Sequence, residues 1–261
     1  MEGSREIPDF ILIQDVHRRP EVQEHIAALI EYAHQAWGMQ EVLIEGAFGP
    51  VDLSGYEKGT FDRARLSAWI QQGVLSGSEM AALAIHHSGD QDFRLTGIEA
   101  PFLYRANLKA YQDVQTVRAA ALRELSSMPL LSAFPGFPTN LSDRIERLIR
   151  LKLTPSDFKA GQSDPIESVA SPVIAQAVRM ASIFYEIADL RTAAFLEHLL
   201  ETQDPVCRVV VVGGFHAEGM ADVLRQAHRS FVVLAPQINE AGDDRVYNDR
   251  LAQTLNALDI P

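Results

Sequence analysis

The chain has 261 residues, of which 47% are hydrophobic and 22% are charged. This is the composition of a globular protein, and it excludes disordered and collagen-like chains. The formal net charge of −12 would repel a phosphate backbone, so we expect no nucleic-acid partner. The single cysteine, Cys207, excludes an intrachain disulfide and any zinc or redox site built on paired cysteines.

The sequence shows no sign of a membrane span. Its longest uninterrupted apolar run extends only from Met80 to Ile85, whereas a membrane helix needs about 18 apolar residues or more. We therefore expect a soluble, cytoplasmic protein, although cleavage of a signal peptide would leave the same sequence.

Short apolar runs and amphipathic helices alternate at the start of the chain. Residues 10–13 predict a buried strand, Pro20 begins a helix that ends at Gly38, and residues 42–45 predict a second strand. A strand, a helix and a strand in this order form a βαβ unit, whose strands are parallel. Two helices are expected in residues 61–87 and a third strand in residues 94–99.

The middle of the chain is almost wholly helical. Strand patterns return at residues 209–212 and 231–234, with a helix between them, and residues 251–258 predict a closing helix. We therefore predict an α/β fold, in which a mostly parallel sheet is flanked by helices. It forms a single α/β domain over residues 1–261, with a core of residues 8–99 and 205–261 and a helical insertion at about 100–204.

Polar residues follow the predicted strands, at the edge where parallel sheets bind ligands. They are Asp15 and His17 after the first strand, Glu45 at the end of the second, Glu99 after the third and His216 after the fourth. Two histidines with two or three carboxylates can bind a divalent metal or transfer protons to and from water. Alternatively, the carboxylates cap helices and the histidines are only hydrogen-bonded.

Arg191 is the one charged residue on an apolar helical stripe, where it lies between Ala188 and Phe195. A buried guanidinium needs a partner, because removing a charge from water without one is costly. The partner can be structural, either a carboxylate or the carbonyls at the end of a helix. It can also be the oxyanion of a substrate or intermediate.

Four segments form a series in chain order: Gln14-Asp-Val-His17, Leu43-Ile-Glu45-Gly46, Arg191 on a late helix, and Gly213-Gly-Phe-His216. The series resembles the superfamily that joins erythromycin esterases, Tiki proteases, TraB/PrgY proteins and ChaN haem-binding lipoproteins. Its members have a GxxH after the first strand, a Glu after the second, an Arg on a late helix and a second GxxH. Here Gln14 replaces the Gly of the first GxxH.

The motif sequences are most similar to those of uncharacterised bacterial members of this superfamily, because Glu21-Val-Gln23 follows the first motif and Ala217-Glu-Gly219 follows the last. The resemblance implies that His17, Glu45, Arg191 and His216 are the catalytic residues. Asp15 and Glu99 are expected in supporting positions.

The first hypothesis is a hydrolase that adds water to an ester, lactone or amide of a small-molecule or peptide substrate. Glu45 would be the general base, and Arg191 would stabilise the oxyanion. His17 and His216 would position the water, directly or through one divalent metal bound with Glu45. The alternative is a ChaN-like protein that binds haem or another ligand without turnover.

Overall fold

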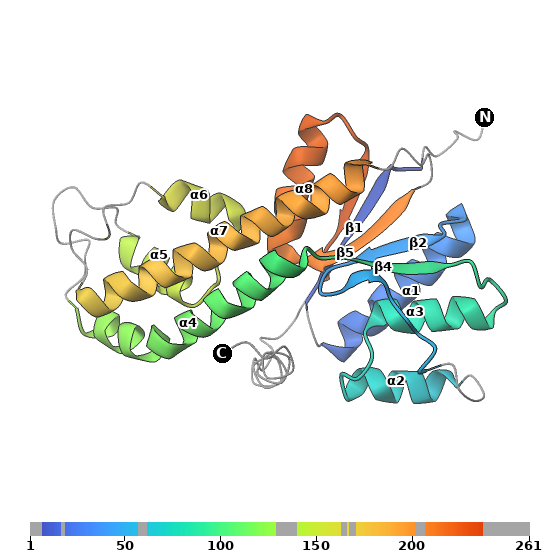
Figure 1. The fold of residues 1–261 in the computed structure, drawn as a ribbon, viewed down its shortest axis with the longest axis horizontal. Helices are drawn as coiled ribbons and strands as arrows, with labels where there is room; N and C mark the ends of the chain where they lie inside the picture. Colours follow the sequence, from blue (N-terminus) through green and yellow to red (C-terminus); the bar gives the residue numbers. More distant parts are fainter. Residues whose placement is uncertain are drawn as a thin grey trace. The chain divides into compact units, whose positions relative to one another are not determined.

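The computed structural model describes residues 7–16, 19–56, 62–128, 140–162, 166, 171–201 and 207–236. The helix expected at residues 251–258 lies outside them. In chain order the elements are β1 (Phe10–Asp15), α1 (Pro20–Trp37), β2 (Glu41–Ile44), β3 (Phe48–Pro50), α2 (Arg63–Gln71), α3 (Gly77–His87), β4 (Arg94–Ile98), α4 (Pro101–Ser127), α5 (Leu141–Ile149), α6 (Pro155–Gly161), α7 (Pro172–Glu201), β5 (Arg208–Gly213), α8 (Gly214–Gln226) and β6 (Phe231–Leu234) (Figure 1).

The chain divides into two compact units. Among the described residues, those up to residue 100 and those from 193 to 236 form a unit that carries the sheet, and those from 101 to 192 form a helical unit. The second boundary falls inside α7, whereas the predicted insertion extends to about residue 204. The difference arises because Phe195, Leu196 and Leu199, in the last turns of α7, pack in the core of the sheet unit. The assignment of a single domain stays a prediction.

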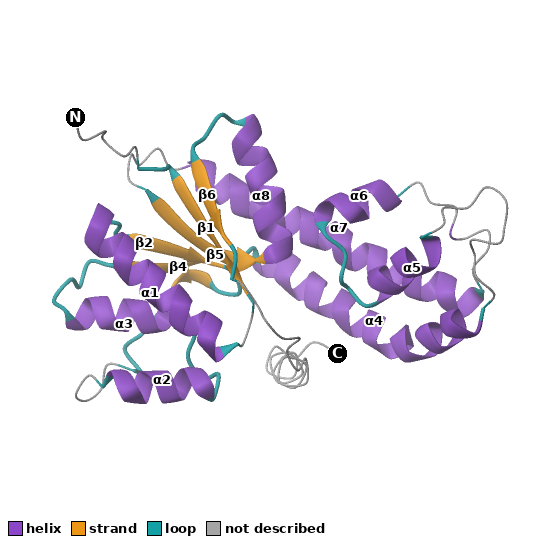
Figure 2. Cartoon of the chain, turned by 180° about the vertical axis from the view of Figure 1, so that it is seen from behind, coloured by secondary structure: helices purple, strands orange, loops and turns teal. Residues whose placement is uncertain are grey.

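The sheet has six strands in the order β3-β4-β2-β5-β1-β6. The pairings of β1 with β5 and β6, and of β2 with β4 and β5, are all parallel, and only β3 runs antiparallel to its neighbour β4. Helices cover both faces, with α1 and α3 on one side and α8 on the other (Figure 2). The prediction of a mostly parallel α/β sheet flanked by helices is confirmed.

The core follows from the alternation of side chains along each strand. Ile11, Ile13, Val209 and Val211 point to the face covered by α1, α2 and α3, whereas Phe10, Leu12, Val210 and Val212 point to the face covered by α8 and the end of α7. Strands that are buried on both faces read as continuous apolar runs, which is why these strands could be predicted.

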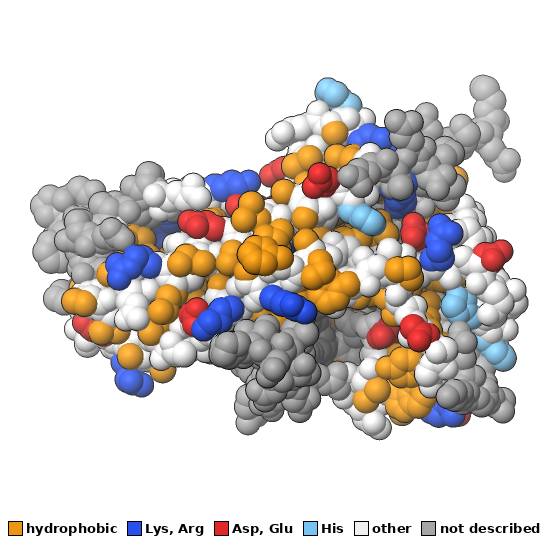
Figure 3. Space-filling model, in the orientation of Figure 1, with side chains coloured by type: hydrophobic (Ala, Val, Ile, Leu, Met, Phe, Trp, Pro, Cys, Tyr) orange, Lys and Arg blue, Asp and Glu red, His pale blue; other side chains and the backbone are white. Residues whose placement is uncertain are grey.

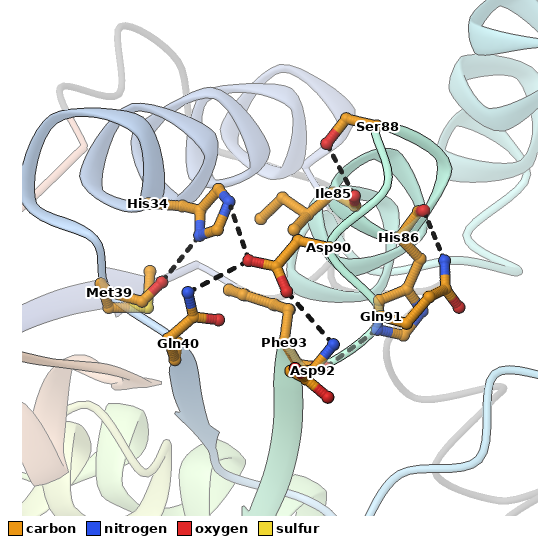
Figure 4. Close-up of polar contacts among 10 residues, drawn as sticks. All are labelled: His34, Met39, Gln40, Ile85, His86, Ser88, Asp90, Gln91, Asp92 and Phe93. Carbon is orange, nitrogen blue, oxygen red and sulfur yellow. Dashed lines mark hydrogen bonds and ion pairs between the residues drawn. The ribbon is translucent and has the colours of Figure 1, made fainter.

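A polar cluster joins the end of α1, the residue before β2 and the turn before β4 at the amino edge of the sheet (Figure 4). Nδ1 of His34 lies 2.8 Å from the carbonyl oxygen of Met39, and Nε2 lies 3.6 Å from the carboxylate of Asp90. Gln40 donates to the same carboxylate at 3.0 Å, and this hydrogen bond holds the pKa of Asp90 below its usual value. The cluster ties the end of α1 to the turn before β4, so His34 has a structural role.

The helical unit packs around residues of α4, α5, α6 and α7. Tyr185 of α7 is fully buried; its ring stacks on Phe158 with centroids 4.9 Å apart, and its hydroxyl accepts the N–H of Leu153 at 2.7 Å. Burial raises the pKa of Tyr185 to about 12. The phenol is therefore neutral across the physiological range and anchors the loop before α6.

Some apolar side chains of the helical unit lie on its surface. Figure 3 shows hydrophobic side chains gathered over α7, and the exposed ones in α4 and α7 include Phe102 (81% exposed), Leu190 (56%) and Ile183 (49%). Within the described part of the chain, no helix combines the length and the hydropathy required to cross a bilayer.

Cys207, the residue before β5, provides a simple test of the core. Its side chain is buried, and burial raises the pKa of the thiol from 9.0 to about 11. Because the thiolate is the reactive form, this rise lowers the reactive fraction about 100-fold. We expect the native protein to react with a disulfide reagent near pH 8 at least about 100-fold more slowly than the urea-unfolded chain. Similar rates in the two states would show that Cys207 is accessible.

Candidate functional site

The candidate site lies at the carboxyl edge of the sheet, where β1, β5 and β2 are neighbours. Asp15 is paired with Gly213 across β1 and β5, and the N–H of Glu45 donates to the carbonyl of Val211 at 3.0 Å. Parallel pairing thus brings Asp15, Glu45 and the start of α8 to one edge, although they are far apart in the sequence.

The carboxylate of Glu45 is engaged through both oxygens. Oε2 accepts the N–H of Gly213 at 2.7 Å, and Oε1 lies 3.4 Å from Nε2 of His216. Gly213 is the N-cap of α8, so the carboxylate lies at the positive end of that helix. The side chain is only 11% exposed. The donor and the helix end together stabilise the anionic carboxylate.

His216 lies in the first turn of α8 and is 4% exposed. Its ring contacts two aromatic rings edge to face, with centroid distances of 5.0 Å to Phe195 and 5.7 Å to Phe215. The imidazole therefore has an apolar surround and a carboxylate at Nε2. This is the arrangement in which a carboxylate orients a histidine ring.

Glu99 supports the turn that carries Glu45. Its Oε1 accepts the N–H of Gly46 at 3.2 Å, and its own N–H donates to the carbonyl of Ala47 at 3.1 Å. The turn lies directly over β4, where an added Cβ at Gly97 would overlap the backbone of Ala47. Glu99 is thus placed to hold the Glu45 turn in position.

Gln23 is a polar residue near the site to which the sequence analysis assigned no role. Its Nε2 donates to Oδ1 of Asp15 at 2.6 Å, although it comes from α1. The side chain is buried, at 6% exposure, and it belongs to the segment Glu21-Val-Gln23. A polar residue next to Val22 on the buried stripe of a helix was the signal that could have identified it.

The predicted metal ligands are His17, Glu45 and His216, but His17 lies outside the described residues. Across the residues that the structure does describe, no group of three or more His, Cys, Asp or Glu side chains could hold a metal ion. Glu45 and His216 supply two donors of the predicted set. The metal site therefore stays a prediction, as does the catalytic role of His17.

Arg191 belongs to the helical unit and is 6% exposed. Its Nη1 donates to Oδ1 of Asn107 at 2.9 Å, and its guanidinium carbon lies 5.6 Å from the centre of the Tyr104 ring. Asn107 in turn donates to the carbonyl of Phe184 at 3.0 Å. These contacts fix the guanidinium within α4 and α7, and its role with Glu45 and His216 stays a prediction.

Comparisons with known proteins place few constraints on the chain. No protein-family model matches the sequence, and no curated protein matches it either. Among solved structures, the chain is similar to ChaN of Campylobacter jejuni, in a structure described as showing cofacial haem binding. The two share 10% sequence identity and a TM-score of 0.41, over 90% of this chain and 84% of that chain.

Proposed function

We propose that the carboxyl edge of the sheet binds a small molecule, with the Glu45–His216 pair at the centre of the site. The observation that supports this is the buried contact of 3.4 Å between the two side chains, at the N-terminus of α8. Buried titratable groups that meet at the carboxyl edge of a parallel sheet are typical of ligand sites.

Hydrolysis of an ester, lactone or amide is the first function that we propose for this pair. Glu45 is engaged by Gly213 and His216, so we assign the acceptance of a proton from water to His216, through Nδ1, because Nε2 faces Glu45. Glu45 would then orient the imidazole and stabilise its cation. This division of roles differs from the sequence-based hypothesis, in which Glu45 itself was the base.

Ligand binding without turnover is the second function. The carboxylate of Glu45 already has partners on both oxygens. This observation counts against hydrolysis with Glu45 as the base and favours ligand binding. A site whose polar groups are satisfied can hold a ligand without activating water. The second function therefore requires less rearrangement of the described side chains than the first.

Haem is a poor fit to His216 as an axial ligand. The ring is 4% exposed between Phe195 and Phe215, and Nε2 lies 3.4 Å from Glu45. An axial imidazole must present a ring nitrogen to iron beside a broad apolar face. We therefore assign no part of the mechanism to haem at this residue.

The deciding experiment combines three assays on the purified wild-type protein. They are turnover on a panel of esters, lactones and peptides, elemental analysis, and melting curves with each panel compound and with haemin. Turnover that depends on His216 supports hydrolysis. A melting shift without turnover, lost in His216→Gln, supports binding alone. If neither turnover nor any melting shift depends on Glu45 or His216, the proposed site is wrong.

Arg191→Lys tests the predicted oxyanion role. Lysine keeps the positive charge but loses the planar fork, so we expect turnover to fall by roughly 10²-fold. Loss of the hydrogen bond from the buried guanidinium to Asn107 should cost about 1.5 to 3 kcal/mol in the free energy of unfolding. Arg179→Lys, an exposed change on the same helix, is the control. Unchanged turnover in Arg191→Lys would leave this residue a purely structural role.

A further inference from the structure

The side chain of Gln23 joins two elements that flank the site. Its Oε1 accepts the N–H of Gly77, the first residue of α3, at 2.8 Å, and its Nε2 donates to Oδ1 of Asp15 at 2.6 Å. A backbone N–H can only donate, so the amide oxygen must face Gly77 and the amide nitrogen must face Asp15. The orientation of the amide is thereby determined, and Asp15 is required as an acceptor.

The packing of α1 against α3 makes this arrangement rigid. An added Cβ at Gly77 would overlap the backbone carbonyl of Gln23, so the two helices touch at this point. The start of α3 is also held by a capping box, in which Ser76 and Glu79 exchange hydrogen bonds between side chain and backbone. The backbone of Gln23 is therefore fixed by helix packing, and its side-chain amide is fixed by hydrogen bonds.

Asp15 connects the Gln23 side chain to the site. It ends β1 and is paired with Gly213, whose N–H binds the carboxylate of Glu45. A displacement of the Asp15 end of β1 would thus be transmitted to the backbone group that holds Glu45. The hydrogen bonds of the Gln23 side chain go to Asp15 and Gly77, so it acts on Glu45 through another residue.

We propose that Gln23 is a positioning residue of the site: it holds the Asp15 carboxylate at the carboxyl edge of the sheet, beside the Gly213 backbone that binds Glu45. The role rests on the proposed function of this edge. The competing interpretation is that Gln23 only joins α1 to α3, and that Asp15 is a convenient acceptor. The two interpretations predict different function for a protein in which the hydrogen bonds are kept and the negative charge is moved from position 15 to position 23.

The double variant Gln23→Glu with Asp15→Asn makes that exchange. The new carboxylate at position 23 can still accept the N–H of Gly77, the new amide at position 15 can donate to its second oxygen, and the net charge is unchanged. We expect a melting temperature close to that of wild type. We also expect a loss of about 10²-fold in kcat/KM on the best panel substrate, or loss of the melting shift with a ligand that binds without turnover. Wild-type function in the exchanged protein would overturn the proposal.

Amide NMR spectra test the positioning without any activity. In Gln23→Leu, the signals of Asp15 and Gly213 should move together with that of Gly77. Ser76→Ala removes the capping box at the same helix end without touching Asp15, and it should move only signals near α3. If Gly77 moves in Gln23→Leu while Asp15 and Gly213 do not, Gln23 is only a link between helices.

The two arms also separate this proposal from the proposed function. The signals of Asp15 and Gly213 can move in Gln23→Leu although the wild-type protein neither turns over nor binds any panel compound. That combination would show that Gln23 positions Asp15 and that the proposed function is wrong. Asp15→Asn alone supplies a further check if Gln23→Leu fails to fold, because it keeps the hydrogen bond from Gln23 and removes only the charge. The kcat/KM or the ligand-dependent melting shift of Asp15→Asn should fall as far as that of the double variant.

Discussion

Glu45→Gln is expected to lower turnover by about 10²- to 10⁴-fold while the protein stays folded. Glutamine has nearly the same shape, and its amide oxygen can still accept the N–H of Gly213. However, it carries no charge, so it cannot stabilise a protonated His216, from which Glu45 lies 3.4 Å away. Steady-state kinetics across the panel, with melting curves on the same samples, measure both parts of the expectation.

Glu41→Gln is the matched control, because Glu41 lies at the other end of the same strand. Its carboxylate accepts the hydroxyl of Thr96 at 2.8 Å and pairs with Arg94, away from the carboxyl edge. The same chemical change at Glu41 should leave turnover within about twofold of wild type, since it touches only the hydrogen bond from Thr96 and a surface ion pair. Equal losses in the two variants would point to a general effect of charge on the strand rather than to a site.

Gly97→Ala is expected to have the largest effect on stability, about 3 kcal/mol or more in the free energy of unfolding. The added Cβ would overlap the backbone of Ala47 and Phe48, and backbone atoms cannot move aside as the end of a flexible side chain can. Either β3 separates from β4, or the turn that carries Glu45 is displaced. Urea denaturation monitored by circular dichroism measures the loss.

Gly55→Ala is the control for this change. Nothing lies within 4 Å of a Cβ added at Gly55, so the same substitution should change the free energy of unfolding by no more than about 0.5 kcal/mol. In folded Gly97→Ala protein, the hydrogen bond from Gly46 to Glu99 should also weaken, because it spans the same contact. A Gly97→Ala protein as stable as wild type would show that the two backbones are not in contact.

The sequence predicted the strands that are continuous apolar runs, including the partly exposed β6, and missed β3. Residues 208–213 and 10–15 are apolar runs between turn residues, and such runs persist whatever their neighbours are. By contrast, β3 has three residues, Phe48, Gly49 and Pro50, two of which disfavour strands. It exists only because β4 offers it an edge, and no local pattern encodes that pairing.

For the site, residue types at strand ends could be predicted, but not the bonds between them. Glu45 and His216 were expected at one edge because parallel strands end there. The bond from Gly213 to Glu45 depends on the path of the backbone, and the bond from Gln23 to Asp15 depends on how α1 crosses the sheet. Both are tertiary features, which a one-dimensional pattern does not contain.

The strand order has a consequence for how the chain folds. β1 is synthesised before both of its partners, β5 and β6, which come after residue 207. Until they emerge from the ribosome, β1 exposes an apolar strand with neither neighbour in place, which is the condition that favours aggregation. Folding of the sheet is therefore dominated by contacts between segments far apart in the sequence, which makes it slow and dependent on the synthesis of β5 and β6.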